Sequence, residues 1–344
     1  MRGAEKGAAQ GTQRPILVTG CPRSGTTFVG KVIGQSPEVF YIYEPFNDEA
    51  PHHLDLPERF VALGASGAET GGHGTALDAQ IGDMIALGRP AVRWRKAMQG
   101  ALEFKAREPD LAGRLAAREF AYRRESFARA SRVCIKDPLA FFAAEYLADA
   151  HDAQVVVMVR HPASVISSYL ALDWPSEMGA IAGRDLALDD AALAAEVAGF
   201  DPAARPNIDG LILQWRLFAT ATLELAERRP DWIFVVHDDL CLDPETHMRA
   251  MFDALGLTFG DAIAGRLRRD TTHAAPESVQ NHSQHRHRRN SRELVDGWRD
   301  RLEPAVADRI MAETVVLWER VQATLRPDYQ FESLAKKDGR QNYS

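Results

Sequence analysis

The chain has 344 residues, of which 45% are hydrophobic and 26% charged; this composition excludes wholesale disorder and suffices for one large domain or two small ones. Its formal net charge of −7 disfavours nucleic-acid binding, so a polyanionic ligand would need a local basic cluster. No apolar run reaches the roughly 20 residues of a membrane-spanning helix, so we expect no integral membrane contact.

The first predicted elements follow a polar segment over residues 1–14, which we expect to be a flexible tail. A short apolar run over 15–20 predicts a buried strand, and apolar residues at helical spacing predict a helix over 26–35. Residues 39–43 are aromatic and β-branched, which predicts a second strand. The Gly-rich and mixed-charge region over 51–130 predicts a helical insertion or acceptor lid.

The second part of the chain alternates strands with helices. Strands are predicted over 133–136, 154–159 and 232–236, and helices over about 139–150, 162–172, 211–228 and 244–255. Strands that are continuous apolar runs are typical of a parallel sheet with both faces covered. We therefore predict an α/β fold, a parallel sheet flanked by helices on both faces, in one domain over 15–330 with a tail over 331–344.

The segment over residues 19–27, TGCPRSGTT, joins the first predicted strand to the first predicted helix. A loop in this place points backbone N–H groups and the positive end of the helix dipole at one spot, which suits a phosphate. Gly25 allows close approach of the backbone, and Ser24, Thr26 and Thr27 add hydroxyl donors. We predict a phosphate-binding loop, against the alternative of a turn that only joins two elements.

This loop departs at one position from the triphosphate-binding pattern G-x-x-x-x-G-K-[ST]. Gly20 and Gly25 match the two glycines, but Thr26 stands where the pattern has lysine. That lysine neutralises the β- and γ-phosphates, so its replacement argues against ATP hydrolysis or kinase chemistry. Arg23 supplies a cation from inside the loop instead, where a guanidinium can bind the 5′-phosphate of a shorter nucleotide.

A second anion site is predicted where the strand over 154–159 ends. Arg160 follows that strand, and ligands of parallel sheets bind at the carboxyl ends of the strands. Ser168 lies about two turns into the next predicted helix, on a face that can reach the same ligand. Arg160 and Ser168 together suit a second phosphate; the alternative is a capping arginine and a solvated serine.

These motifs resemble those of the sulfotransferase superfamily. The run PRSGTT over 22–27 is similar to the family's 5′-phosphosulfate loop, and Arg160-x-Pro162 with Ser168 is similar to its 3′-phosphate site. The run FYIYEP over 40–45 resembles the carbohydrate sulfotransferase branch. The resemblance implies a fold related to P-loop nucleoside kinases, the donor 3′-phosphoadenosine-5′-phosphosulfate (PAPS) with the product adenosine 3′,5′-bisphosphate, and no metal.

The resemblance also indicates the residues that contact the donor. The candidates are Arg23, Ser24, Gly25, Thr26, Thr27, Phe28, Arg160, Ser168 and one of Arg288, Arg289 and Arg292. Packing against adenine by Phe28 competes with a place in the core, and the C-terminal arginines could equally form a solvated basic loop. His237 stands where the family usually has a tyrosine, which puts an adenine contact there in doubt.

The chemistry of sulfonate transfer indicates three catalytic candidates. Charge develops on the leaving phosphate, so we predict that Arg23 and Lys136, at the end of the third strand, stabilise it. An acceptor hydroxyl gains from a general base, and Glu44 is the first choice because the carbohydrate branch uses a carboxylate in this region. The reserves for this role are His52, His53 and Asp137; the alternatives are an ordinary strand-end lysine and a surface glutamate.

Two other functions remain possible from the sequence. A nucleotide kinase or ATPase could use Asp238 and Asp239, which follow an apolar strand, to hold magnesium. A non-catalytic nucleotide-binding module would keep the loop and lack the base. For the transferase we expect a carbohydrate or glycosylated small molecule as acceptor, and the sequence does not indicate the oligomeric state.

The three cysteines allow a prediction of the cellular compartment in which the protein works. Cys21, Cys134 and Cys241 are widely spaced and form no CxxC or metal-binding pattern. This usage suits a reducing compartment, and residues 1–14 have no apolar signal-peptide core. We therefore expect a cytoplasmic protein.

Overall fold

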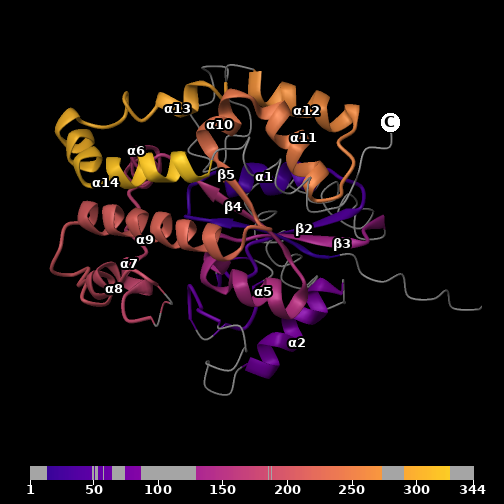
Figure 1. Ribbon diagram of the computed structural model, residues 1–344, viewed down its shortest axis with the longest axis horizontal. Coiled ribbons are helices and arrows are strands. Elements are labelled where there is room, and N and C mark those ends of the chain that lie inside the picture. Colours follow the sequence, from indigo (N-terminus) through magenta and orange to yellow (C-terminus); the bar gives the residue numbers. More distant parts are fainter. Residues whose placement is uncertain are drawn as a thin grey trace, which may run out of the picture.

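The computed structural model describes residues 14–48, 50, 53–56, 58–63, 74–86, 129–184, 186, 188–272 and 290–325 (Figure 1). In this part of the chain a five-stranded sheet has the order β2-β3-β1-β4-β5, and every pairing is parallel. The strands are β1 (Ile16–Gly20), β2 (Val39–Tyr43), β3 (Arg132–Lys136), β4 (Gln154–Val159) and β5 (Ile233–Val236). The predicted α/β fold with a parallel sheet is confirmed.

Successive side chains of each strand enter different hydrophobic clusters. In β1, Ile16 and Val18 belong to one cluster and Leu17 to the other. This follows from the pleat, because successive side chains of a strand point to opposite faces. Both faces of the sheet are therefore buried, which explains why the strands read as continuous apolar runs.

The cluster that contains Ile16 and Val18 is covered by helices that follow β1 and β5 in the chain. These are α1 (Thr26–Ile33), α10 (His237–Leu242), α11 (Pro244–Ala254) and α12 (Asp261–Thr272). Met248, Met251 and Phe252 of α11 are fully buried there. In Figure 1, α1, α11 and α12 lie above the sheet.

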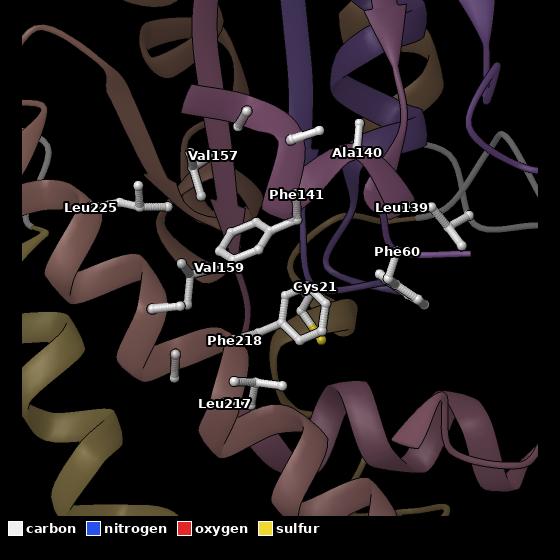
Figure 2. Packing of buried hydrophobic residues seen from close by; sticks show 14 of the residues in the cluster. Cys21, Phe60, Leu139, Ala140, Phe141, Val157, Val159, Leu217, Phe218 and Leu225 are labelled. Carbon is white, nitrogen blue, oxygen red and sulfur yellow. The ribbon is translucent and has the colours of Figure 1, made fainter. Parts of the chain in front are cut away.

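The cluster that contains Leu17 lies on the opposite face of the sheet. Its helices are α2 (Gly74–Ile85), η2 (Pro138–Ala143), α5 (Ala144–His151), α6 (Pro162–Leu170), α7 (Met178–Ile181), α8 (Ala191–Ala198), α9 (Asn207–Arg228) and α14 (Pro304–Thr324). In Figure 1, α2, α5 and α9 lie below the strands and α6 and α14 lie to their left. Figure 2 shows Phe141 of η2 next to Phe218 of α9, with ring centroids 4.8 Å apart. The short helix α13 (Glu293–Asp296) contacts α6 and α10.

Several elements differ from the prediction. The helix predicted over 139–150 begins as the 3₁₀ segment η2, because Pro138 starts it and Asp137 accepts the Leu139 N–H. The helix predicted from 211 begins at Asn207. The helices α7, α8, α10, α12, α13 and α14 were not predicted.

The predicted insertion over 51–130 lies largely outside the described residues. Its described part contains α2, which packs Leu77, Ile81 and Met84 into the core of the domain. The predicted tail over 331–344 also lies outside the described residues. Nowhere in the described part of the chain is a helix both long and apolar enough to cross a bilayer.

Candidate functional site

A large cavity lies at the carboxyl ends of the strands. Its volume is about 1670 Å³, and it is lined by the loops after β1, β2 and β4 and by residues of α10 and α12. The neighbours β1 and β4 continue in opposite directions, to β2 on one edge of the sheet and to β5 on the other. Such a switch point is where open parallel sheets bind ligands.

The loop after β1 packs closely against β4 and α10. Gly20 has φ 136°, and a Cβ there would overlap the carbonyl oxygen of Met158. Gly25 has φ 98°, and a Cβ there would overlap the His237 ring. Because α1 begins at Thr26, its first N–H groups have no partner inside the helix. The loop can thus offer N–H donors to an anion.

Arg23 projects from this loop along the cavity wall. Its Nε donates to Ser168 Oγ at 2.9 Å, and its guanidinium lies 5.3 Å from the centre of the Trp174 ring. Its φ of 73° is uncommon for a residue with a side chain. Burial lowers the pKa of Arg23 from the ordinary arginine value through loss of solvation.

Arg160 comes from the end of β4 and contacts the same loop. Its Nη1 donates to the Arg23 carbonyl at 3.1 Å, and its Nη2 donates to the Leu294 carbonyl at 3.4 Å. Its own carbonyl accepts the Trp215 indole N–H at 2.9 Å. Burial lowers the pKa of Arg160 to about 10, so the side chain is a cation at neutral pH. The two arginines predicted for two phosphates therefore lie together, whereas Ser168 pairs with Arg23 and not with Arg160.

Two buried polar atoms beside these arginines have no partner among the described residues. They are the hydroxyl of Ser24 and the Nε of Arg160. Buried polar groups normally form hydrogen bonds, and each unpaired group costs about 1–3 kcal/mol. The loop and the end of β4 therefore present a cationic, donor-rich surface with unused hydrogen-bonding capacity, which suits a phosphorylated ligand.

Glu44 and Lys136 form a buried ion pair. Tyr43 lies opposite Lys136 in the β2–β3 register, and the Glu44 N–H donates to the Lys136 carbonyl at 2.8 Å. The Lys136 ammonium donates to the Glu44 carboxylate and lies 3.9 Å from the centre of the Tyr43 ring. Lys136 is fully buried; desolvation lowers its pKa, and the Glu44 charge opposes that shift. Glu44 lines the cavity, and Lys136 lies behind it.

Asp137 fixes the turn that carries Glu44. One of its carboxylate oxygens accepts the Phe46 N–H and the other accepts the Leu139 N–H. Burial, and secondly the Glu44 charge, raise the pKa of Asp137 to about 7. Since both of its oxygens are engaged in these contacts, Asp137 is a structural neighbour of Glu44 in this arrangement.

The other predicted residues are distributed as follows. Gly25, Thr26, Thr27 and Phe28 line the cavity, and Phe28 also packs against the core beneath α1. Arg292 is exposed beside α13, where its neighbour Ser291 lines the cavity. His53 contacts the Leu54 carbonyl. Arg288, Arg289 and His52 lie outside the described residues.

His237 lies beneath the loop rather than at the surface. Its ring touches Gly25 and is 3.6 Å from the Cys241 sulfur. Burial, and secondly the charge of Arg160, lower the pKa of His237 to about 4. A neutral imidazole at neutral pH is compatible with a place next to bound adenine or with simple packing against the loop.

Sequence reasoning missed several residues that line the cavity. Trp174 and Glu177 come from the stretch after α6, Arg59 from the segment after β2, and Arg266 and Arg269 from α12. No motif marks them, because they reach the cavity through tertiary packing alone. Among the described residues, no three His, Cys, Asp or Glu side chains could together hold a metal ion.

The loop after β1 and Arg160 meet at the switch point of a parallel sheet in an α/β protein. Residues 15–261 match the sequence profile of the sulfotransferase family. The chain belongs to this family. No curated protein matches it by sequence.

Three solved sulfotransferase structures are among those that resemble this chain. The sulfotransferase domain of the Synechococcus olefin synthase is 18% identical, with a TM-score of 0.44 over 93% of this chain and 98% of that one. The domain from the curacin biosynthetic pathway is 13% identical, with a TM-score of 0.44 over 87% and 96%. The sulfotransferase from Alicyclobacillus acidocaldarius is 16% identical, with a TM-score of 0.40 over 91% and 96%.

Proposed function

We propose that this protein transfers a sulfonate group from PAPS to an acceptor hydroxyl of a carbohydrate or a glycosylated small molecule. The observation that carries the proposal is the link between Arg23 and Arg160 through the Arg23 carbonyl. Two cations at neighbouring strand ends suit the two phosphates of one nucleotide. Family membership supports the reaction, and Thr26 in place of the loop lysine disfavours a triphosphate.

The residues present fit this donor. The 5′-phosphate would be held by Arg23, Ser24 and the N–H groups at the start of α1, and the 3′-phosphate by Arg160. The unpaired Ser24 hydroxyl and Arg160 Nε are the observations that support this placement. Phe28 and His237 line the part of the cavity next to the loop and are the candidates for adenine.

When bound, PAPS supplies an activated sulfonate and a phosphate leaving group. Glu44 accepts the proton of the acceptor hydroxyl, whose oxygen bonds to sulfur while the bond from sulfur to the 5′-phosphate oxygen breaks. Arg23 stabilises the negative charge that the departing phosphate takes with it. Lys136 is the second cation of the site and holds the Glu44 carboxylate in place.

A direct test measures transfer from labelled PAPS together with binding of adenosine 3′,5′-bisphosphate. We expect turnover without added divalent cation. The variant Glu44→Gln should keep nucleotide affinity within about twofold and lose about 100-fold or more in turnover, the range of general-base contributions. Glu319→Gln, an exposed change on α14, is the matched control and should behave as wild type.

The outcomes separate the alternatives. Full activity of Glu44→Gln would overturn the base assignment, and binding without any transfer would indicate a non-catalytic module. A requirement for ATP and magnesium in place of PAPS would overturn the proposed reaction. A panel of labelled acceptors, with sugar and phenolic hydroxyls side by side, tests the acceptor class.

A further inference from the structure

The carboxylate of Glu44 is held from two sides. Its Oε1 accepts a hydrogen bond from the Lys136 ammonium, and its Oε2 accepts one from the side-chain N–H of Asn47 at 2.9 Å. Tyr43 also forms a side-chain hydrogen bond with Glu44. Lys136 is fully buried, whereas Asn47 lines the cavity. Oε1 therefore lies on the buried side of the carboxylate and Oε2 on the side of the cavity.

The backbone of the loop after β2 fixes the position of Asn47 relative to Glu44. The Asn47 N–H donates to the Glu44 carbonyl at 3.1 Å, which closes a turn. The Asn47 carbonyl accepts the Ala50 N–H at 2.9 Å. Phe46, inside this turn, is 1% exposed, and its N–H donates to the Asp137 carboxylate. Because the turn is anchored in the core, the Asn47 side chain reaches Glu44 from a fixed backbone position.

Arg59 contacts the other end of the Asn47 amide. Its Nη1 donates to Asn47 Oδ1 at 3.4 Å, and its Nη2 donates to the Glu177 carboxylate at 3.4 Å. A guanidinium has donors and no acceptor, so it requires the oxygen end of the amide, and the Nδ2 end is then directed to Glu44. The residue after Arg59 is Phe60, which is 1% exposed. The orientation of the Asn47 amide is therefore supported by a residue whose neighbour is fixed in the core.

We propose that Asn47 is a positioning residue for the general base: its amide holds the Glu44 carboxylate in the orientation in which Oε2 faces the acceptor hydroxyl. This inference rests on the proposed function, because it takes Glu44 as the base. A carboxylate oxygen can accept about two hydrogen bonds, so Oε2 keeps a lone pair for the acceptor while Asn47 occupies the other. The hydroxyl proton moves to Oε2 as the hydroxyl oxygen bonds to sulfur and the bond from sulfur to the 5′-phosphate oxygen breaks. A base that turns out of line loses much of its contribution.

The test is a double-variant cycle on turnover of labelled PAPS, with phenyl glucoside and 4-hydroxyphenylethanol as acceptors. Asn47→Ala removes the amide without changing the charge of the site, so kcat should fall about ten- to 100-fold while KM for PAPS stays within about twofold. In the Glu44→Gln background the same change should cost at most about twofold, because a residue that acts through the base then has nothing to position. Equal losses in both backgrounds would mean that Asn47 acts independently of Glu44, and would overturn the inference.

A second variant separates the amide N–H from the size of the side chain. Asn47→Asp keeps the size and an oxygen for Arg59 but has no N–H to donate to Glu44, so kcat should fall at least as far as in Asn47→Ala. A wild-type kcat of Asn47→Asp would mean that the side chain only fills space, against the inference. Glu319→Gln, exposed on α14, should have no effect in either background. Thermal melts verify folding, and if Asn47→Ala does not fold, Asn47→Asp takes its place in the cycle.

If no acceptor is turned over, the proposed function fails on its own. Crystal structures of the wild type and of Asn47→Asp, each with adenosine 3′,5′-bisphosphate, then decide the positioning role without any transfer. A Glu44 carboxylate that leaves its wild-type position in the variant, or occupies several positions, supports the inference. A carboxylate in the same place in both proteins contradicts it, as does a wild-type structure in which Asn47 does not contact Glu44.

Discussion

Arg23 and Glu44, the two residues with the most demanding chemical roles proposed, both have left-handed backbone. Their φ angles are 73° and 46°, which costs a residue with a side chain about 1–2 kcal/mol. Specific contacts maintain each conformation. The Arg160 guanidinium donates to the Arg23 carbonyl, and the Glu44 N–H donates to the backbone carbonyl of Lys136. Strain of this kind gathers where a side chain must be aimed, here from two separate loops toward one cavity.

The contribution of the Arg23 charge can be separated from that of its backbone. Asparagine adopts left-handed φ more readily than other residues with side chains, so Arg23→Asn should fold as the wild type does. Turnover with PAPS should fall about 100-fold or more, because the leaving phosphate loses its cation. Arg23→Ala should lose the same activity and in addition about 1 kcal/mol of unfolding free energy. Steady-state kinetics and urea unfolding measure both; near-normal turnover of Arg23→Asn would remove Arg23 from the chemistry.

His237 should make the free energy of unfolding depend on pH in the acidic range. Its pKa is about 4 in the folded protein and 6.5 in an ordinary environment, so the unfolded chain binds the proton first as the pH falls. Stability from this group is fully present above pH 6.5 and is lost as the pH falls from 6.5 to about 4, by about 3 kcal/mol. His237→Gln should lack this component. Urea unfolding of both proteins from pH 4 to 7 tests it: a pH-independent difference between them would contradict the burial of a neutral imidazole.

At the scale of elements, the sequence predicts the position of a strand or helix when the pattern within that one element is sufficient. The strand ends fall within one residue of the prediction, as at β5, predicted from 232 and observed from Ile233. Buried parallel strands are recognisable in a sequence as uninterrupted apolar runs. The helix α14 also carries a signal, since Ile310, Thr314 and Trp318 are buried at steps of four.

What the sequence does not contain is the pairing between elements. Lys136 meets Glu44 across 92 residues of chain, and only the β2–β3 register brings Tyr43 opposite Lys136. The partner of Ser168 likewise depends on the packing of α6 beside the loop: from the sequence it was predicted to act with Arg160, and its hydrogen bond is from Arg23. Individual candidate residues were therefore predictable, but their contacts were not.

The junction between the loop and α1 tolerates no side chain at Gly25. A methyl group there meets both an unfavourable φ and the His237 ring, so Gly25→Ala should destabilise the protein by about 1–3 kcal/mol and weaken nucleotide binding. The matched change Gly82→Ala lies inside α2, where a new Cβ meets no atom of the described residues within 4 Å. It should stabilise by about 0.5–1 kcal/mol. Calorimetric melts compare the two, and equal effects would contradict the described packing of the loop.

At the scale of the whole molecule, one sheet separates two hydrophobic clusters that share no side chain. Phe218 fills the cluster under α9 and Phe252 the cluster under α11, and both are buried. Replacing either by alanine should cost about 3–5 kcal/mol, from lost burial and the cavity that remains. Because the two sites lie on opposite faces and have no common neighbours in either cluster, the losses should add within about 0.5 kcal/mol in the double variant.

The same pair of changes tests whether the domain unfolds as a unit. Both clusters are built on the same five strands, so losing either face removes half the burial of every strand. We therefore expect one transition, with the same midpoint by tryptophan fluorescence and by circular dichroism, in the wild type and in each single variant. Two separated transitions, or a double variant no less stable than the weaker single one, would mean that the faces fold independently. In that case the strand ends that carry Arg23 and Arg160 would not be held by a single cooperative core.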